Sequence, residues 1–259
     1  MDFTFTEDQL MFREAISRFL MTEAAPETLR EIWETDAGRS PELRNKMAEQ
    51  GLTALSVPEQ FGGLGMGDIA WSLMTQELGY YAIPDSLADT AYVGSGVFSA
   101  LDDSVACKAD YLAKICDGEL RLAIGHQCSE LVSDAHLAQV LLMQHADEVH
   151  LVPCEQVDNV VNLSIDSSRR LSQVTWQPTA ETCIAQGEAG KKIWNDTLNR
   201  GALSVAGQLL GLAQRMLDLT VDYSVQRKQF GKAIGSFQAV KHHLADVAGK
   251  IEIAKPVLY

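Results

Sequence analysis

Apolar residues recur at helical spacing near the start of the chain. The first apolar face comprises Phe12, Ala15, Ile16, Phe19 and Leu20. Thr6 stands just before this face and Gln9 follows three residues later, which is the spacing of a capping box. The pattern therefore predicts an amphipathic helix that begins next to Thr6.

Turn-forming residues divide the region that follows. A second helix is predicted over 41–51, because this stretch opens with proline, a favoured first helical residue, and closes with glycine. The stretch 57–65 holds one proline and three glycines, which predicts a loop. Asp68 can cap a third helix, and 86–101 and 104–116 are predicted as two more.

From Leu120 the pattern changes to short apolar or alternating runs between polar turns. These runs are 120–124, 137–143, 149–152 and 171–176. Runs of this length and character are typical of β-strands. Helical spacing returns near Lys191, so the strands form only a small β unit.

Two long apolar patterns, each stepping alternately by three and four residues, fill the last third of the chain. The first comprises Leu198, Ala202, Val205, Leu209, Leu212, Met216, Leu219 and Tyr223. The second comprises Phe237, Val240, Leu244, Val247, Ile251, Ala254 and Leu258. Gly207 and Gly211 would allow another helix to approach closely. Two helices are too few to close a bundle, so we expect helices from further sequence or from a partner to complete it.

The order of these patterns defines the expected fold class, a mainly α protein with a small central β unit. We expect an α-helical domain over 1–119, a β domain over 120–186 and an incomplete helical bundle over 187–259.

Composition restricts the class of partner. The chain has 259 residues with 21 Lys and Arg against 35 Asp and Glu, a formal net charge of −14, which argues against nucleic acid and anionic membranes as partners. No signal peptide or membrane-spanning run is recognisable. The five cysteines form no metal-ligand pattern, which favours free thiols and a cytoplasmic protein.

The stretch Tyr223–Gln238 reads YSVQRKQFGKAIGSFQ. It resembles the second signature of the acyl-CoA dehydrogenase family. Residues 5–20 and the stretch 51–79, which contains the loop VPEQFGGLG, are also similar to that family. The resemblance covers nearly the whole chain, and the order of helices, β unit and helices agrees with the family fold.

The resemblance implies FAD as cofactor and an acyl-CoA thioester as substrate. It implies that Arg227 reaches the FAD pyrophosphate of a neighbouring subunit, for which a forked cation is suited. Gln229 would contact phosphate, Phe230 would pack on the cofactor and Gln238 would hydrogen-bond it. The plainer alternatives are a surface charge for Arg227, a core residue for Phe230 and a solvated helix position for Gln238.

The chain also departs from the family. Gly201 stands where one branch carries the catalytic glutamate on the long helix, so no catalytic residue is assigned. The first family signature is unrecognisable at 124–130, where Glu130 is expected to be a turn residue. No metal site is expected, because His126 and Cys128 lack a third ligand.

With these departures, the chain resembles the non-catalytic partner subunits of heteromeric acyl-CoA dehydrogenases, the kind associated with steroid side-chain degradation. We therefore expect a homo- or hetero-oligomer, with a complete dehydrogenase subunit as the expected partner. Two alternatives stay open: an ordinary dehydrogenase of which this chain is a piece, and a flavin-free helical scaffold.

Overall fold

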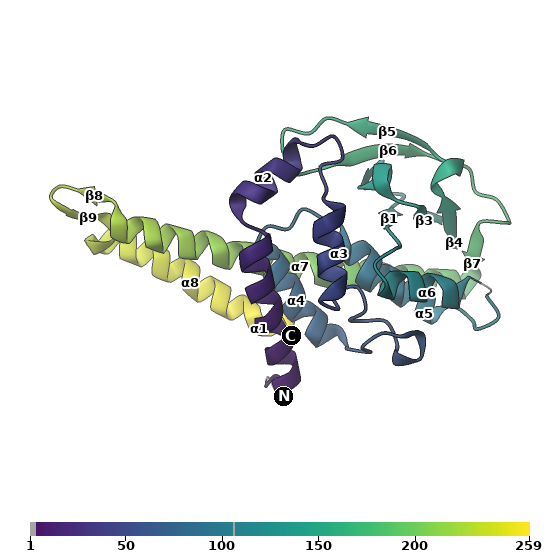
Figure 1. The fold of residues 1–259 in the computed structure, drawn as a ribbon, viewed down its shortest axis with the longest axis horizontal. Helices are drawn as coiled ribbons and strands as arrows, with labels where there is room; N and C mark the ends of the chain where they lie inside the picture. Colours follow the sequence, from purple (N-terminus) through teal and green to yellow (C-terminus); the bar gives the residue numbers. More distant parts are fainter. Residues whose placement is uncertain (1–3, 106) are drawn as a thin grey trace. The chain divides into compact units, whose positions relative to one another are not determined.

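The structure, a computed structural model, describes residues 4–105 and 107–259. It confirms a mainly helical fold with small sheets (Figure 1). The chain forms two compact units: the first consists of Met1–Ala25, Ser72–Ile83 and Leu203–Tyr259, and the second of Pro26–Trp71 and Pro84–Ala202. The three domains expected from the sequence are a different division of the chain and stay a prediction.

Local sequence signals explain where several helices begin and end. The helices are α1 (Glu7–Glu23), α2 (Pro26–Glu34), α3 (Pro41–Glu49), α4 (Asp68–Tyr80), α5 (Ser95–Ala100), α6 (Lys108–Cys116), α7 (Gly187–Gln226) and α8 (Gln238–Leu258). The capping box of α1 is formed, since Gln9 N donates to Thr6 Oγ1 at 3.2 Å and Thr6 N donates to Gln9 Oε1 at 3.0 Å. Gly51 follows α3 with φ 81°, the left-handed conformation expected there. No helix within the described residues is long and apolar enough to cross a membrane.

The first unit is held together by an unusually close approach of α4 and α7. A Cβ atom added at Gly211 would lie 1.9 Å from the carbonyl oxygen of Gln76, and one added at Gly79 would lie 2.0 Å from that of Gln208. Glycine is therefore required at both positions, because any side chain would force the two backbones apart. Tyr80 also donates to Asp218 at 2.9 Å across the same pair of helices.

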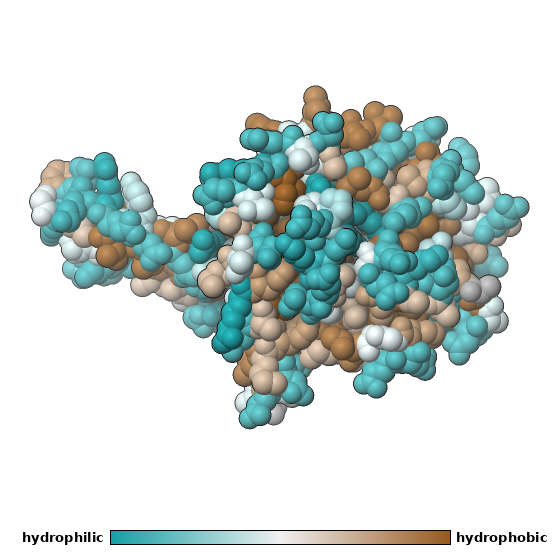
Figure 2. Space-filling view, in the orientation of Figure 1, coloured by the Kyte–Doolittle hydropathy of each residue, from teal (hydrophilic) through white to brown (hydrophobic). Residues whose placement is uncertain are grey.

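The opposite face of α7 in this unit is apolar and exposed. We call its six large side chains the apolar stripe; they are Val205, Leu209, Leu212, Met216, Leu219 and Tyr223. Leu209 is 60% exposed and Met216 is 56% exposed. Hydrophobic residues are visible along the paired helices α7 and α8 in Figure 2. The spacing that predicted a bundle seam is thus present, and within the described residues nothing covers it.

The second unit contains two small sheets and most of the buried apolar residues. The strands are β1 (Leu122–Gly125), β2 (Leu131–Ser133), β3 (Val140–His145), β4 (Glu148–Pro153), β5 (Asp158–Asn162), β6 (Leu171–Thr175) and β7 (Cys183–Ala185). One sheet has the order β1-β3-β4-β7 and the other β2-β6-β5. Leu142 pairs with Leu151 in the first sheet, whose inner face packs on Phe98, Trp194 and neighbouring apolar residues.

The structure differs from the predicted elements at several short segments. The helix expected over 86–101 consists of a π-helical turn, η2 (Asp89–Gly94), followed by α5. Helix α2 and strands β2, β5 and β7 were not predicted. These strands have three to five residues, so they offer few alternating positions from which a pattern could be read.

Candidate functional site

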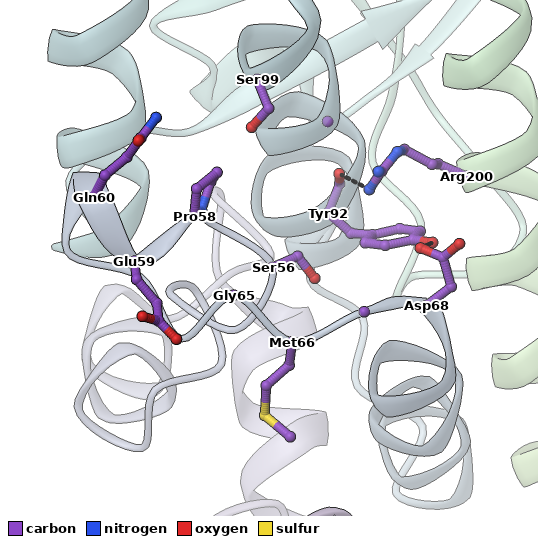
Figure 3. Close-up of a pocket in the computed structure, with 12 residues that line it drawn as sticks. Ser56, Pro58, Glu59, Gln60, Gly65, Met66, Asp68, Tyr92, Ser99 and Arg200 are labelled. Carbon is purple, nitrogen blue, oxygen red and sulfur yellow. Dashed lines mark hydrogen bonds between the residues drawn. The ribbon is translucent and has the colours of Figure 1, made fainter.

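A pocket of about 730 Å³ opens in the second unit (Figure 3). The loop that precedes α4, the helical segment η2–α5 and α7 line it. Its polar lining residues are Ser56, Glu59, Gln60, Asp68, Ser99 and Arg200. Pockets of this size accommodate small organic ligands, which usually meet mostly apolar walls. The predominance of polar side chains therefore distinguishes this pocket.

Arg200 is held in the pocket wall by an aromatic stack. Its guanidinium carbon lies 4.5 Å from the centroid of the Tyr92 ring, and Nη1 donates to the Tyr92 carbonyl oxygen at 3.3 Å. Tyr92 stacks in turn on Trp71, with 4.9 Å between ring centroids. Gly96 makes room for the cation, since a Cβ atom there would lie 2.4 Å from Arg200 Nε. This arrangement presents a fixed cation to the pocket.

The carboxylate of Asp68 accepts a hydrogen bond from the hydroxyl group of Tyr92. The Tyr92 hydroxyl donates to Asp68 Oδ1 at 2.6 Å. Burial raises the pKa of the Tyr92 hydroxyl, and the hydrogen bond to Asp68 raises it further. Tyr92 is therefore a neutral donor at physiological pH, and the pocket offers both hydrogen-bond donors and a carboxylate acceptor.

Gly201 follows Arg200 directly in α7. A Cβ atom at this position would meet no other atom within 4 Å, so the backbone borders open space there. Without a side chain, Gly201 can supply neither a general base nor a side-chain hydrogen bond. The pocket can bind and orient a ligand, and position 201 adds no proton acceptor to it.

The four residues expected to bind the cofactor lie at the connection between α7 and α8, in the first unit. The connection is a hairpin of β8 (Lys228–Gln229) and β9 (Lys232–Ala233) (Figure 1). Arg227 precedes it, Gln229 and Phe230 belong to it, and Gln238 begins α8. All four are exposed, and within the described residues no ion pair engages the Arg227 guanidinium. Their role in cofactor binding stays a prediction.

Phe230 has a strained backbone at the tip of this hairpin. Its φ is 53° and that of Gly231 is 79°, which makes a tight two-residue turn. A bulky residue with positive φ is uncommon, and such strain is often associated with function. The Phe230 side chain is 92% exposed, so the strain does not serve to bury the ring in this chain.

A cluster of buried charges occupies another part of the second unit. Arg44 and Arg121 both donate to the carboxylate of Asp85, at 2.6 and 3.0 Å. Nearby, the pKa of Asp89 is raised to about 7, mainly by burial and then by the negative charges of Asp134 and Asp85. Sequence patterns gave no sign of this cluster, because its members are far apart along the chain.

The minor candidates take ordinary structural places. Glu130 is exposed and accepts from Gln173 at 3.4 Å, consistent with a residue on the rim of the sheet. Within residues 4–105 and 107–259, no group of three His, Cys, Asp or Glu side chains could hold a metal ion.

The glycine-rich loop before α4 follows the short helical turn η1 (Glu59–Phe61), with φ values of 88° at Gly62 and 61° at Gly65.

Two family models match the chain. The N-terminal domain of acyl-CoA dehydrogenases matches residues 6–119, and the C-terminal domain matches residues 188–259. The chain belongs to the acyl-CoA dehydrogenase family. The resemblance identified from the sequence is thereby confirmed.

Relatives within the acyl-CoA dehydrogenase family share most of the chain. This chain is 30% identical over 256 residues to the acyl-CoA dehydrogenase IpdE2 of Mycolicibacterium smegmatis, and the match covers 98% of this chain and 76% of that protein. The fold is similar to a variant of the Tcur3481–Tcur3483 steroid acyl-CoA dehydrogenase, with a TM-score of 0.84, 23% identity and coverage of 97% of this chain and 76% of that one. It is also similar to the ChsE4–ChsE5 complex of Mycobacterium tuberculosis, with a TM-score of 0.82, 21% identity and coverage of 100% and 79%.

Sequence reasoning missed the residues that form the pocket. Arg200 was given no role, and Asp68 was considered only as a helix cap. Tyr92 lies more than a hundred residues before Arg200, so no local spacing could connect them. The one available signal was the excess of basic residues after position 199, eight Lys and Arg against four Asp and Glu, to which Arg200 contributes.

Proposed function

We propose that this chain is the partner subunit of an FAD-dependent acyl-CoA dehydrogenase. In this role it completes a flavin site at a subunit interface and leaves the catalytic base to another polypeptide. The observation that carries the proposal is the combination of an exposed Arg227 beside a strained hairpin with a glycine at position 201. The first feature suits a cofactor shared between subunits, and the second leaves this chain without the family's helix-borne base.

The family reaction removes one proton next to the thioester carbonyl and a hydride from the adjacent carbon. The proton requires a carboxylate base, and bound FAD supplies the hydride acceptor. Arg227 would pair with the pyrophosphate through its forked donors. Gln229 and Gln238 would add hydrogen bonds, and the exposed ring of Phe230 would cover part of the cofactor. The unpaired guanidinium of Arg227 and the exposed ring of Phe230 are chemically suited to binding FAD.

The apolar stripe supports assembly with a second polypeptide. Contiguous exposed apolar surface on a soluble protein often marks an interface. Position 201 lies on the same helix as the stripe, so a subunit that covers α7 would be close to the place where a base is needed. Two structures with this fold carry paired names, ChsE4–ChsE5 and Tcur3481–Tcur3483, which is the type of heteromeric assembly proposed here.

The test is the flavin content of the assembled complex at limiting FAD, measured by its absorbance spectrum. Arg227→Ala should bind FAD at least about thirtyfold more weakly, because removing one partner of a charge-assisted pair costs about 2–5 kcal/mol. The FAD affinity of Arg227→Lys should lie between those of the wild type and Arg227→Ala. An ammonium keeps the positive charge but loses the paired donors of the guanidinium.

Arg30→Ala, which removes an exposed arginine from α2, is the matched control and should keep its flavin. Equal flavin occupancy in the wild type and Arg227→Ala would reject the cofactor role. A complex that assembles without any flavin would favour the scaffold alternative.

A further inference from the structure

We infer that the pocket of the second unit binds an acyl group that carries a hydroxyl substituent, in preference to a plain hydrocarbon chain. The inference rests on the proposed function, because it takes an acyl thioester as the ligand. It goes further by naming the chemical class of that acyl group.

The pocket wall is unsuited to a purely hydrocarbon ligand. Ser56, Gln60 and Ser99 line it together with the charged side chains of Asp68 and Arg200. An alkyl chain that displaced water from these groups would leave polar atoms without hydrogen-bond partners, which is unfavourable. A ligand with an oxygen substituent restores some of these bonds.

The cation in this wall has a fixed position. Arg200 is stacked on Tyr92 and bonded to the Tyr92 carbonyl oxygen, and Gly96 leaves room for its guanidinium. A guanidinium carries five N–H donors and no acceptor, so it can donate to a ligand oxygen while Nη1 donates to the Tyr92 carbonyl oxygen. A ligand oxygen can therefore accept a hydrogen bond from a donor that is already oriented.

Charge decides between a hydroxyl group and a carboxylate on the ligand. Among the lining residues, Glu59 and Asp68 are acidic and Arg200 is the one base. A ligand carboxylate would add a third negative charge to this pocket, which is unfavourable in a partly desolvated site. A hydroxyl group is neutral and can accept from Arg200 while it donates to Asp68. Figure 3 shows these two side chains on the same side of the pocket, next to the Tyr92 ring.

Calorimetric titration with matched thioesters tests the inference on the full chain. The four-carbon series is butyryl-CoA, 4-hydroxybutyryl-CoA and succinyl-CoA, which differ only in the terminal group; octanoyl-CoA and 8-hydroxyoctanoyl-CoA repeat the comparison at greater length. For at least one of the two chain lengths, the hydroxylated thioester should bind at least about tenfold more tightly than its hydrocarbon counterpart. This is the effect of one net hydrogen bond. Succinyl-CoA should bind more weakly than 4-hydroxybutyryl-CoA.

Variants connect this preference to the pocket. Arg200→Met keeps the length of the side chain, removes its donors and should abolish the preference, whereas Arg200→Lys should keep part of it. Lys192→Met removes an exposed positive charge from the same helix and should change nothing. Equal or tighter binding of the hydrocarbon thioesters by the wild type, or no binding of any thioester, would overturn the inference.

Thioester binding is measured without flavin, so it is separate from the test of the proposed function. Loss of the flavin role with a retained hydroxyl preference would reject the dehydrogenase proposal alone. Flavin binding without that preference would reject this inference alone.

Discussion

The two faces of α7 in the first unit show opposite designs on a single helix. One face carries small residues and lies against α4 so closely that a methyl group at Gly211 would overlap the Gln76 carbonyl oxygen. The other face carries the apolar stripe and is exposed. The small residues supply stability within the chain, whereas the large apolar residues supply surface for another chain. The size of a side chain on this helix therefore does not predict how deeply it is buried.

The largest effect that this comparison predicts is on the close-packed face. Gly211→Ala should lower the free energy of unfolding by about 3 kcal/mol, because the added methyl group meets backbone atoms of α4 that cannot rotate away. The measurement is the urea midpoint of the full chain. Gly249→Ala on α8 is the control: its Cβ atom would meet nothing within 4 Å, so helix propensity should raise stability by about 0.5–1 kcal/mol. Similar midpoints for the two variants would show that α4 and α7 are not in close contact.

The second effect concerns the apolar stripe. Leu209→Glu combined with Met216→Glu should weaken assembly about a hundredfold, because two buried charges would replace apolar contacts in an interface. The urea midpoint of the isolated chain should change little, since both positions are exposed within it. Sedimentation with the partner subunit measures assembly.

Asn195→Glu, which adds the same charge at an exposed polar position of α7, is the control and should assemble normally. Normal assembly of the stripe variant would show that the interface lies on another surface.

A smaller effect extends the comparison from packing to charge. The raised pKa of Asp89, about 7, means that the folded state holds a proton on this carboxyl between about pH 4 and pH 7 that the unfolded state releases. The contribution of Asp89 to the free energy of unfolding is therefore most favourable at low pH and decreases as the pH rises through this window. Above about pH 7 it no longer changes. Asp89→Asn should gain about 2–3 kcal/mol of stability relative to the wild type when the pH is raised from 5 to 8. Urea titrations at both pH values measure this difference, and parallel pH dependence of the two proteins would contradict it.

The sequence predicted the features that depend on neighbouring residues. The capping box at Thr6, the proline start of α3 and the left-handed Gly51 are local events, and the structure contains all three. The close approach at Gly207 and Gly211 was also anticipated from side-chain size. The predicted seam on α7 has the right spacing, but spacing alone could not show whether this chain or another one covers it.

The candidate site was only partly predictable, because its two parts arise differently. Arg227, Gln229, Phe230 and Gln238 are close in sequence, so the hairpin brings them together and a family signature could indicate them. Asp68, Tyr92 and Arg200 belong to three distant segments that meet only after the second unit has folded. No short pattern encodes such a meeting, and the polar character of the pocket became apparent only in three dimensions.

The discontinuous make-up of the first unit has a consequence for synthesis on the ribosome. Its helices α1 and α4 emerge early, but they need α7 and α8, which follow only after most of the second unit has been made. Gln76 and Phe5 both contact Tyr259, so these early segments cannot complete their contacts before residue 259 has been made. Until then, the face of α4 that includes Gly79 has no partner helix, and incompletely packed intermediates of this kind are prone to aggregate. A circular permutant that places α7 and α8 before α1 would shorten this delay without changing any contact in the finished unit.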